Sequence, residues 1–174
     1  NDNEKIADQV RRAGEQLFRF AIDRGDMQTI LDALPVQTQT RRVAMEYEIQ
    51  MLRIVTVGWA IAFFLAEDRM GAPLGASFWE HVRAFSETLS SSAALAANAA
   101  IDYFDVLKQR LDHYVDALNA AGKISDPAMA VGPAFAEACG YKQDACAVLA
   151  GSKMFSHTVH AVHDYLDGIV ARQD

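Results

Sequence analysis

The C-terminal part of the chain carries the residues best suited to binding a metal ion. His157, His160 and Asp164 recur at intervals of three and four residues in a segment expected to be helical. Such spacings place side chains on neighbouring positions of a helix, and neutral imidazoles with a carboxylate bind divalent metals. Helical geometry also places His157 and His160 away from the apolar stripe of this segment, as on a solvated face. We therefore expect no metal cofactor, with a divalent-metal site at His157, His160 and Asp164 as the alternative.

A narrow polar strip crosses the most apolar segment of the chain. Residues 54–66 read IVTVGWAIAFFLA, with Thr56 as their only polar side chain, and Arg53 and Glu46 extend the strip toward the N-terminus. Buried charges must be paired, so the strip is either the wet edge of a helix or the lining of a cavity. In a cavity, the arginine would bind a carboxylate or phosphate beside an apolar aromatic wall. The candidate ligand-binding residues are Glu46, Arg53, Thr56, Trp59 and Phe63.

The remaining nucleophiles and glycines form no recognisable catalytic pattern. The serines lie in stretches expected to be helical or at helix ends, and none belongs to a G-x-S-x-G motif. The pairs Gly132-Pro133 and Gly151-Ser152 do not resemble a phosphate-binding loop. The sequence therefore favours a non-catalytic protein without a cofactor, and it leaves enzymatic activity open.

Two cysteines, Cys139 and Cys146, lie on either side of Gly140. On one continuous helix they would be about 10 Å apart, beyond disulfide reach, whereas a break at the glycine would allow a bridge. We expect two small buried residues in a reducing compartment, with a bridge as the alternative. The expected location is cytoplasmic, and the alternative is an exported chain from which a leader has been removed.

Charge and apolar length limit the classes of partner. The 174 residues include 16 basic and 23 acidic ones, and the net charge of −7 opposes binding to nucleic acid. A membrane-spanning helix needs about 20 apolar residues, and extending residues 54–66 backward to that length brings in Arg53 and Gln50. We therefore expect no nucleic-acid partner and interpret the apolar run as part of a soluble core.

The apolar residues recur at intervals of three and four between glycines and prolines, and no long stretch alternates with a period of two. This pattern predicts an all-α fold: one domain over residues 1–174, with five or six helices around a long central apolar helix at about 38–69. Because residues 54–66 are apolar all round, that helix must be covered on all sides.

Helix boundaries are predicted from capping signals. Asp26 is a suitable N-cap for a short helix ending before Pro35. Ser77 and Glu80 form a capping box, and Asp126-Pro127 supplies the start of another short helix, ending near Cys139. Further helices are expected at about 4–24, 102–121 and 141–171.

These observations predict a non-catalytic helical domain that acts as a small-molecule sensor or as a protein-interaction module. The expected partners are a second copy of the chain or another protein, and a ligand would be small and either anionic or apolar. Two other classes stay open, a metal-binding helical bundle and a membrane-active helical protein. A helical bundle supports many functions, so the fold does not choose among them.

Overall fold

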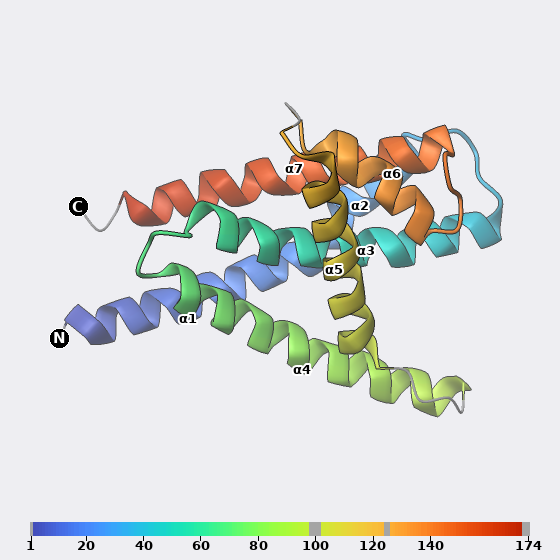
Figure 1. The fold of residues 1–174 in the computed structure, drawn as a ribbon. Helices are drawn as coiled ribbons and strands as arrows, with labels where there is room; N and C mark the ends of the chain where they lie inside the picture. The colour runs from blue at the N-terminus through green and yellow to red at the C-terminus, as the bar shows by residue number, and fades with distance from the viewer. Residues whose placement is uncertain (1, 98–101, 124–125, 172–174) are drawn as a thin grey trace.

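The computed structural model describes residues 2–97, 102–123 and 126–171. Seven α-helices and no strand occur in these ranges, which confirms the predicted all-α bundle (Figure 1). Five of the helices have 19 residues or more, and the other two are short. The helices are α1 (Asp2–Ile22), α2 (Arg24–Asp32), α3 (Gln39–Phe64), α4 (Gly71–Ala97), α5 (Tyr103–Ala121), α6 (Ala128–Ala138) and α7 (Ala145–Val170).

The central position predicted for the apolar helix is confirmed, because α3 contacts all six other helices. Figure 1 shows α1 and α4 running opposite to α3, α7 running in the same direction, and α5 crossing steeply. Ile49, Leu52 and Ile61 are completely buried on different sides of α3. The helix ends at Phe64 and not near Arg69. Covering it on all sides removes its apolar surface from water, which is the main favourable term in folding.

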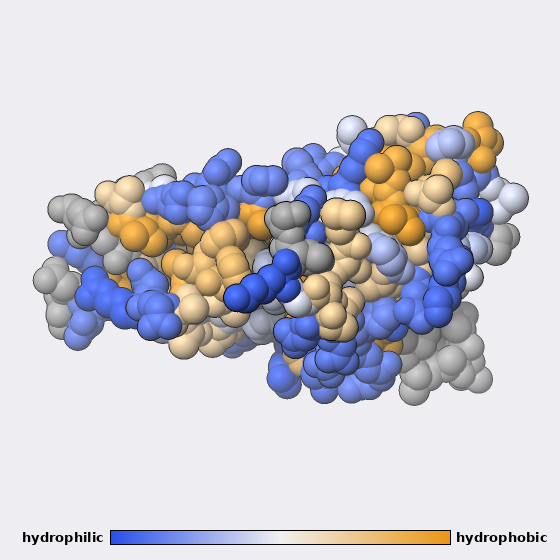
Figure 2. Space-filling model, turned by 45° about the horizontal axis from the view of Figure 1, so that its top comes forward, coloured by the Kyte–Doolittle hydropathy of each residue, from blue (hydrophilic) through white to orange (hydrophobic). Residues whose placement is uncertain are grey.

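One stretch among the described residues could cross a membrane by length and composition alone. It is Arg41–Phe64, whose most apolar 18-residue window has a mean hydropathy of at least 1.2 and is 67% buried inside the fold. A mostly buried core helix passes the same test. The outer surface in Figure 2 is largely polar, with hydrophobic residues gathered toward both ends of the face shown.

Close approach of two helices depends on glycine where α6 crosses α7. A methyl group added at Gly151 would lie 2.5 Å from the Cβ atom of Phe135, and one added at Gly132 would lie 2.1 Å from the Ser152 hydroxyl oxygen. Ser152 also donates a hydrogen bond across 3.1 Å to the carbonyl oxygen of Ala128. The short, apolar α6 is thereby held directly on α7.

Three of the predicted helix starts need correction. α4 begins at Gly71, so Ser77 lies inside the helix and forms no capping box. The serine instead lies against Gly14 of α1, where a Cβ atom would be 2.2 Å from its hydroxyl oxygen. The last helix begins at Ala145, after the N-cap Asp144, and not at Tyr141. In both cases a tertiary contact or a later cap outweighed the local pattern.

The third correction concerns Asp26. The N-cap of α2 is Asp23, whose carboxylate accepts a hydrogen bond from the amide of Gly25 across 2.7 Å. Asp26 therefore lies in the first turn of α2, and its side chain is available to other helices. The Asp126 carboxylate does accept a hydrogen bond from the amide of Ala128, across 3.0 Å, as expected at the start of α6.

Candidate ligand-binding cleft

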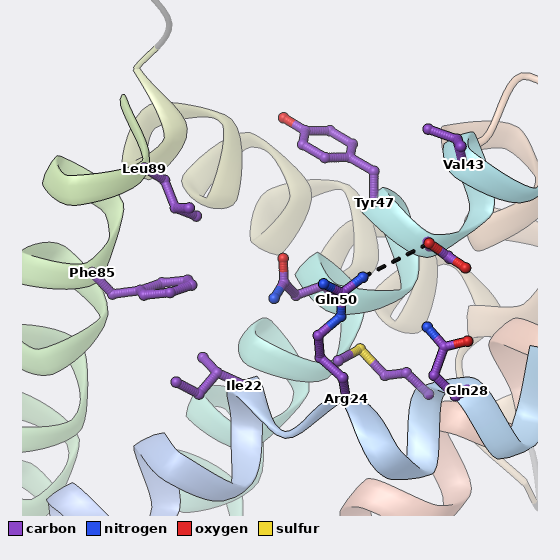
Figure 3. A pocket seen from close by; sticks show the side chains of 10 residues that line it. Ile22, Arg24, Gln28, Val43, Tyr47, Gln50, Phe85 and Leu89 are labelled. Carbon is purple, nitrogen blue, oxygen red and sulfur yellow. Dashed lines mark ion pairs between the residues drawn. The ribbon is translucent and has the colours of Figure 1, made fainter. Parts of the chain in front are cut away.

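A cleft of about 470 Å³ opens where α1 ends. α1 packs against both α3 and α4 and stops at Ile22, whereas α4 continues to Ala97. Beyond Ile22 the chain turns into α2, so the space between α3 and the second half of α4 is left open (Figure 3). The side chains that line it are Ile22, Arg24, Met27, Gln28, Val43, Glu46, Tyr47, Gln50, Phe85 and Leu89.

One wall of the cleft is apolar. Phe85 and Leu89 lie one turn apart on α4 and face α3 across the opening, and Ile22 lies beside them (Figure 3). The ring of Phe85 is fixed by edge-on contacts with Phe18, at a centroid distance of 5.7 Å, and with Tyr103, at 6.3 Å. This wall is a surface on which the apolar part of a ligand could be buried.

The opposite wall is polar and is organised by Arg42, which lies behind it. The Arg42 guanidinium donates hydrogen bonds to Glu46 across 3.2 Å, to Gln28 across 2.9 Å and to Asp32 across 2.6 Å. The hydrogen bonds that Arg42 donates to Asp32 and Glu46 raise the pKa of Arg42. Arg24 forms a longer ion pair with the second oxygen of Glu46, at 3.8 Å. The carboxylate of Glu46 thus lies between two guanidinium groups.

Two tyrosines adjoin the polar wall, Tyr47 as a lining residue that is 43% exposed and Tyr103 through its contact with Gln50. Tyr103 is buried, and its hydroxyl donates to the Gln50 side-chain oxygen across 3.4 Å. Burial raises the pKa of Tyr103, and burial together with the Glu48 carboxylate raises the pKa of Tyr47. Both hydroxyls therefore remain protonated hydrogen-bond donors in neutral solution.

The structure does not bring the five candidate ligand-binding residues together. Glu46 lines the cleft, and Thr56 is buried in the core with 2% exposure. Trp59 stacks on Phe63 with centroids 4.9 Å apart, and Phe63 is 60% exposed near the far end of α3. They occupy separate places because α3 is covered by different helices along its length.

Arg53, the predicted anchor for an anion, is completely buried and is neutralised inside the protein. Its guanidinium donates to the Asp26 carboxylate across 2.9 Å, and its central carbon lies 4.1 Å from the centroid of the Phe20 ring. The same oxygen of Asp26 lies 3.1 Å from Nε2 of His157. Arg53, Asp26 and His157 therefore connect α3, α2 and α7.

The residues of the alternative metal site have different neighbours. His157 contacts Asp26, and Nδ1 of His160 lies 2.8 Å from the carbonyl oxygen of Ser156. Asp164 lies 3.8 Å from His163. Within the described ranges, no three or more His, Cys, Asp or Glu side chains are grouped so that they could hold a metal ion. The two cysteines are free thiols.

Sequence reasoning missed most of the cleft, although part of its signal was present. Val43, Glu46, Tyr47 and Gln50 follow one another at helical spacing and form a mixed stripe on α3. The other wall depends on where α1 stops relative to α4, which has no local signature in the sequence.

Comparison with known proteins adds no family assignment. No protein-family model matches the chain, and neither the curated proteins nor the solved structures include a significant match.

Proposed function

We propose that this protein is a non-catalytic helical domain that binds a small amphipathic molecule in the cleft at the end of α1. The observation that carries the proposal is the facing of two unlike walls, Phe85 and Leu89 on one side and Arg24 and Gln50 on the other. The volume of the cleft, about 470 Å³, lies within the range of about 300–1,000 Å³ that is usual for small-molecule sites. An apolar surface with a few polar groups suits binding and orientation of a ligand.

A sensor role is supported by the way the cleft is connected to the rest of the bundle. A ligand would contact α2, α3 and α4 at once. α2 is also linked to α3 and α7 through Asp26, which contacts Arg53 and His157. A ligand that favoured one position of α2 would therefore shift the packing of helices that it does not touch.

The test fills the cleft with a larger side chain. Leu89→Trp places an indole on the apolar wall, and Ala84→Trp places the same ring at an exposed position of the same helix. The fluorescent probe 1-anilinonaphthalene-8-sulfonate is expected to bind the natural protein at one saturable site, to bind Ala84→Trp equally well, and to lose at least tenfold in affinity for Leu89→Trp. Equal affinity for both variants would contradict the cleft as the binding site, provided that circular dichroism shows both to be folded.

A second candidate function, self-association, is favoured by an exposed aromatic surface at the end of α3. Phe63 is 60% exposed, stacks on Trp59 and lies edge-on to Phe64, at a centroid distance of 5.3 Å. Phe64 in turn contacts His163 of α7, at 4.5 Å. Large exposed aromatic rings of this kind are enriched at protein interfaces.

Sedimentation velocity over a range of protein concentrations tests this second candidate. The natural protein is expected to show a concentration-dependent dimer that Phe63→Ser abolishes. Val36→Ser is the matched control, because Val36 is a fully exposed apolar residue that lies in the connection before α3. A natural protein that stays monomeric at all concentrations would rule out self-association through this surface.

A further inference from the structure

The hydrogen-bonding groups of the cleft are not evenly engaged, and this imbalance points to the chemistry of its ligand. Four polar side chains of the lining carry oxygens that can accept a hydrogen bond. The Tyr47 hydroxyl can also donate to a ligand, and the amide and carboxylate oxygens of the other three are already in use. Gln28 accepts from Arg42, Gln50 accepts from Tyr103, and the two oxygens of Glu46 face Arg42 and Arg24. A ligand that needed a hydrogen-bond acceptor would have to compete with these internal contacts.

The hydrogen-bond donors of Arg24, Gln28 and Gln50 are available. The guanidinium of Arg24 meets Glu46 only at 3.8 Å, beyond hydrogen-bond distance, and its side chain is 68% exposed. Figure 3 shows the amides of Gln28 and Gln50 on either side of this guanidinium. No hydrogen bond links the amide nitrogen of either glutamine to another residue of the described ranges. The polar wall therefore offers the N–H groups of two amides and of one guanidinium.

The charges of the lining narrow the kind of hydrogen-bond acceptor that the ligand can carry. The lining contains two charged groups, Arg24 and Glu46, and Glu46 also accepts a hydrogen bond from Arg42 behind the wall, whose guanidinium is shared with Asp32. A cationic ligand would have to approach Arg24 and displace a guanidinium from Glu46. A phosphate carries nearly two negative charges, and one cation beside a carboxylate does not balance them. A single carboxylate matches the fork of one guanidinium, which can donate to both of its oxygens.

We infer that the ligand is a small monocarboxylate with an apolar body, an inference that rests on the cleft being the ligand site. Its carboxylate would accept hydrogen bonds from Arg24 and from the Gln28 and Gln50 amides. Its apolar body would lie on Ile22, Phe85 and Leu89. The same recognition would disfavour an amine with the same body, because the carboxylate and amide oxygens of the lining are already engaged and the Arg24 guanidinium repels an ammonium group.

The experiment compares three probes that share one apolar body: 4-phenylbutyrate, 4-phenylbutanol and 4-phenylbutylamine. Binding to the natural protein is measured by isothermal titration calorimetry, and chemical-shift changes in ¹H–¹⁵N spectra locate each probe. We expect the carboxylate to bind in the cleft at least tenfold more tightly than the alcohol, and the amine to bind most weakly. An amine or alcohol that binds in the cleft as tightly as the carboxylate would overturn the inference.

Arg24→Gln removes the charge, and Arg19→Gln is its control, because Arg19 is exposed near the same end of α1 and pairs with Glu15 outside the cleft. Arg24→Gln should weaken binding of 4-phenylbutyrate at least tenfold and change the affinity for 4-phenylbutanol by less than a factor of two. Arg19→Gln should change neither affinity. Equal weakening of both probes by Arg24→Gln would overturn the assigned role of Arg24. If shift changes at the cleft are absent for all three probes, both the inference and the proposed site fail. Cleft binding without preference for the carboxylate refutes the inference alone.

Discussion

Asp26 neutralises Arg53 across 2.9 Å although the two side chains differ sharply in exposure. The arginine side chain is completely buried and the aspartate side chain is 45% exposed, so the pair joins the core to the surface of the bundle. The guanidinium also lies against the Phe20 ring, and its Nε and Nη1 atoms have no hydrogen-bond partner in the described residues. Among the polar contacts between α2 and α3, this ion pair is the one whose cation is completely buried.

Asp26→Asn is expected to destabilise the protein by about 2–3 kcal/mol. Removing one partner of a fully buried pair costs about 3–5 kcal/mol, and the exposure of Asp26 together with the polar amide that replaces it reduces this cost. The free energy of unfolding in urea measures the effect. Asp8→Asn is the control, because Asp8 pairs with Arg11 on the surface of α1 and should change stability by less than about 0.5 kcal/mol. Equal effects of the two variants would show that the buried pair contributes nothing special.

The same pair should make stability depend on pH. Partial burial raises the pKa of Asp26, but hydrogen bonds and charges from Arg53 on α3 and His157 on α7 outweigh it, and the pKa lies below the ordinary 3.8. A lowered pKa in the folded state means that the carboxylate stabilises the protein above the unfolded-state pKa and loses this effect as pH falls through the folded-state pKa. The stability difference between the natural protein and Asp26→Asn should therefore be fully present at about pH 5 and shrink as the pH falls below 3.8. A stability difference that persists unchanged at pH 2 would contradict the role of the Asp26 carboxylate in this pH dependence.

The central helix and the Arg53 pair show how far the sequence could be interpreted. Residues 54–66 predicted a helix covered on all sides, because an apolar segment without a polar face has no orientation that leaves one side in water. The sequence also required a partner for a charge on such a helix, but not which one, since Asp26 is 27 positions away and was expected to cap α2. Partners of buried charges are set by helix docking, which is a tertiary property.

The cleft illustrates the same limit at the candidate site. Its α3 stripe, which includes Glu46 and Gln50, was visible as mixed polarity at helical spacing. Its α4 wall gives no such signal, because Phe85 and Leu89 continue the helical spacing of Phe78 and Val82, a single apolar face of the kind that packs in a core. Phe85 and Leu89 do lie on that face, but α1 ends too early to cover them completely. The opening exists because α1 ends before α4 does, and no sequence motif marks this difference.

Cys139 should react far more slowly with alkylating reagents in the folded protein than in the unfolded chain. Burial raises its pKa from 9.0 to about 12, with the Glu48 carboxylate adding to the rise, so the reactive thiolate becomes about a thousandfold rarer. Alkylation by iodoacetamide at about pH 8, followed by peptide mass spectrometry, is expected to be at least a hundredfold slower at Cys139 without urea than in urea. Cys146, the other free thiol, provides an internal check of reagent quality under both conditions. If folding slows the alkylation of Cys139 by less than tenfold, the thiol is not protected by burial as expected.

Two glycines of neighbouring helices should respond oppositely to the same substitution. In Gly132→Ala the new methyl group would lie 2.1 Å from the Ser152 hydroxyl oxygen and 2.8 Å from the carbonyl oxygen of Val148. The backbone oxygen cannot move without shifting α6 off α7, so we expect a loss of about 1–3 kcal/mol. A methyl group at Gly168 meets nothing within 4 Å, and Gly168→Ala should stabilise α7 by about 0.5–1 kcal/mol because alanine has less backbone freedom to lose in the unfolded chain. Thermal and urea unfolding of both variants measure the two signs. A neutral Gly132→Ala would mean that α6 and α7 are not in the close contact on which the docking of α6 depends.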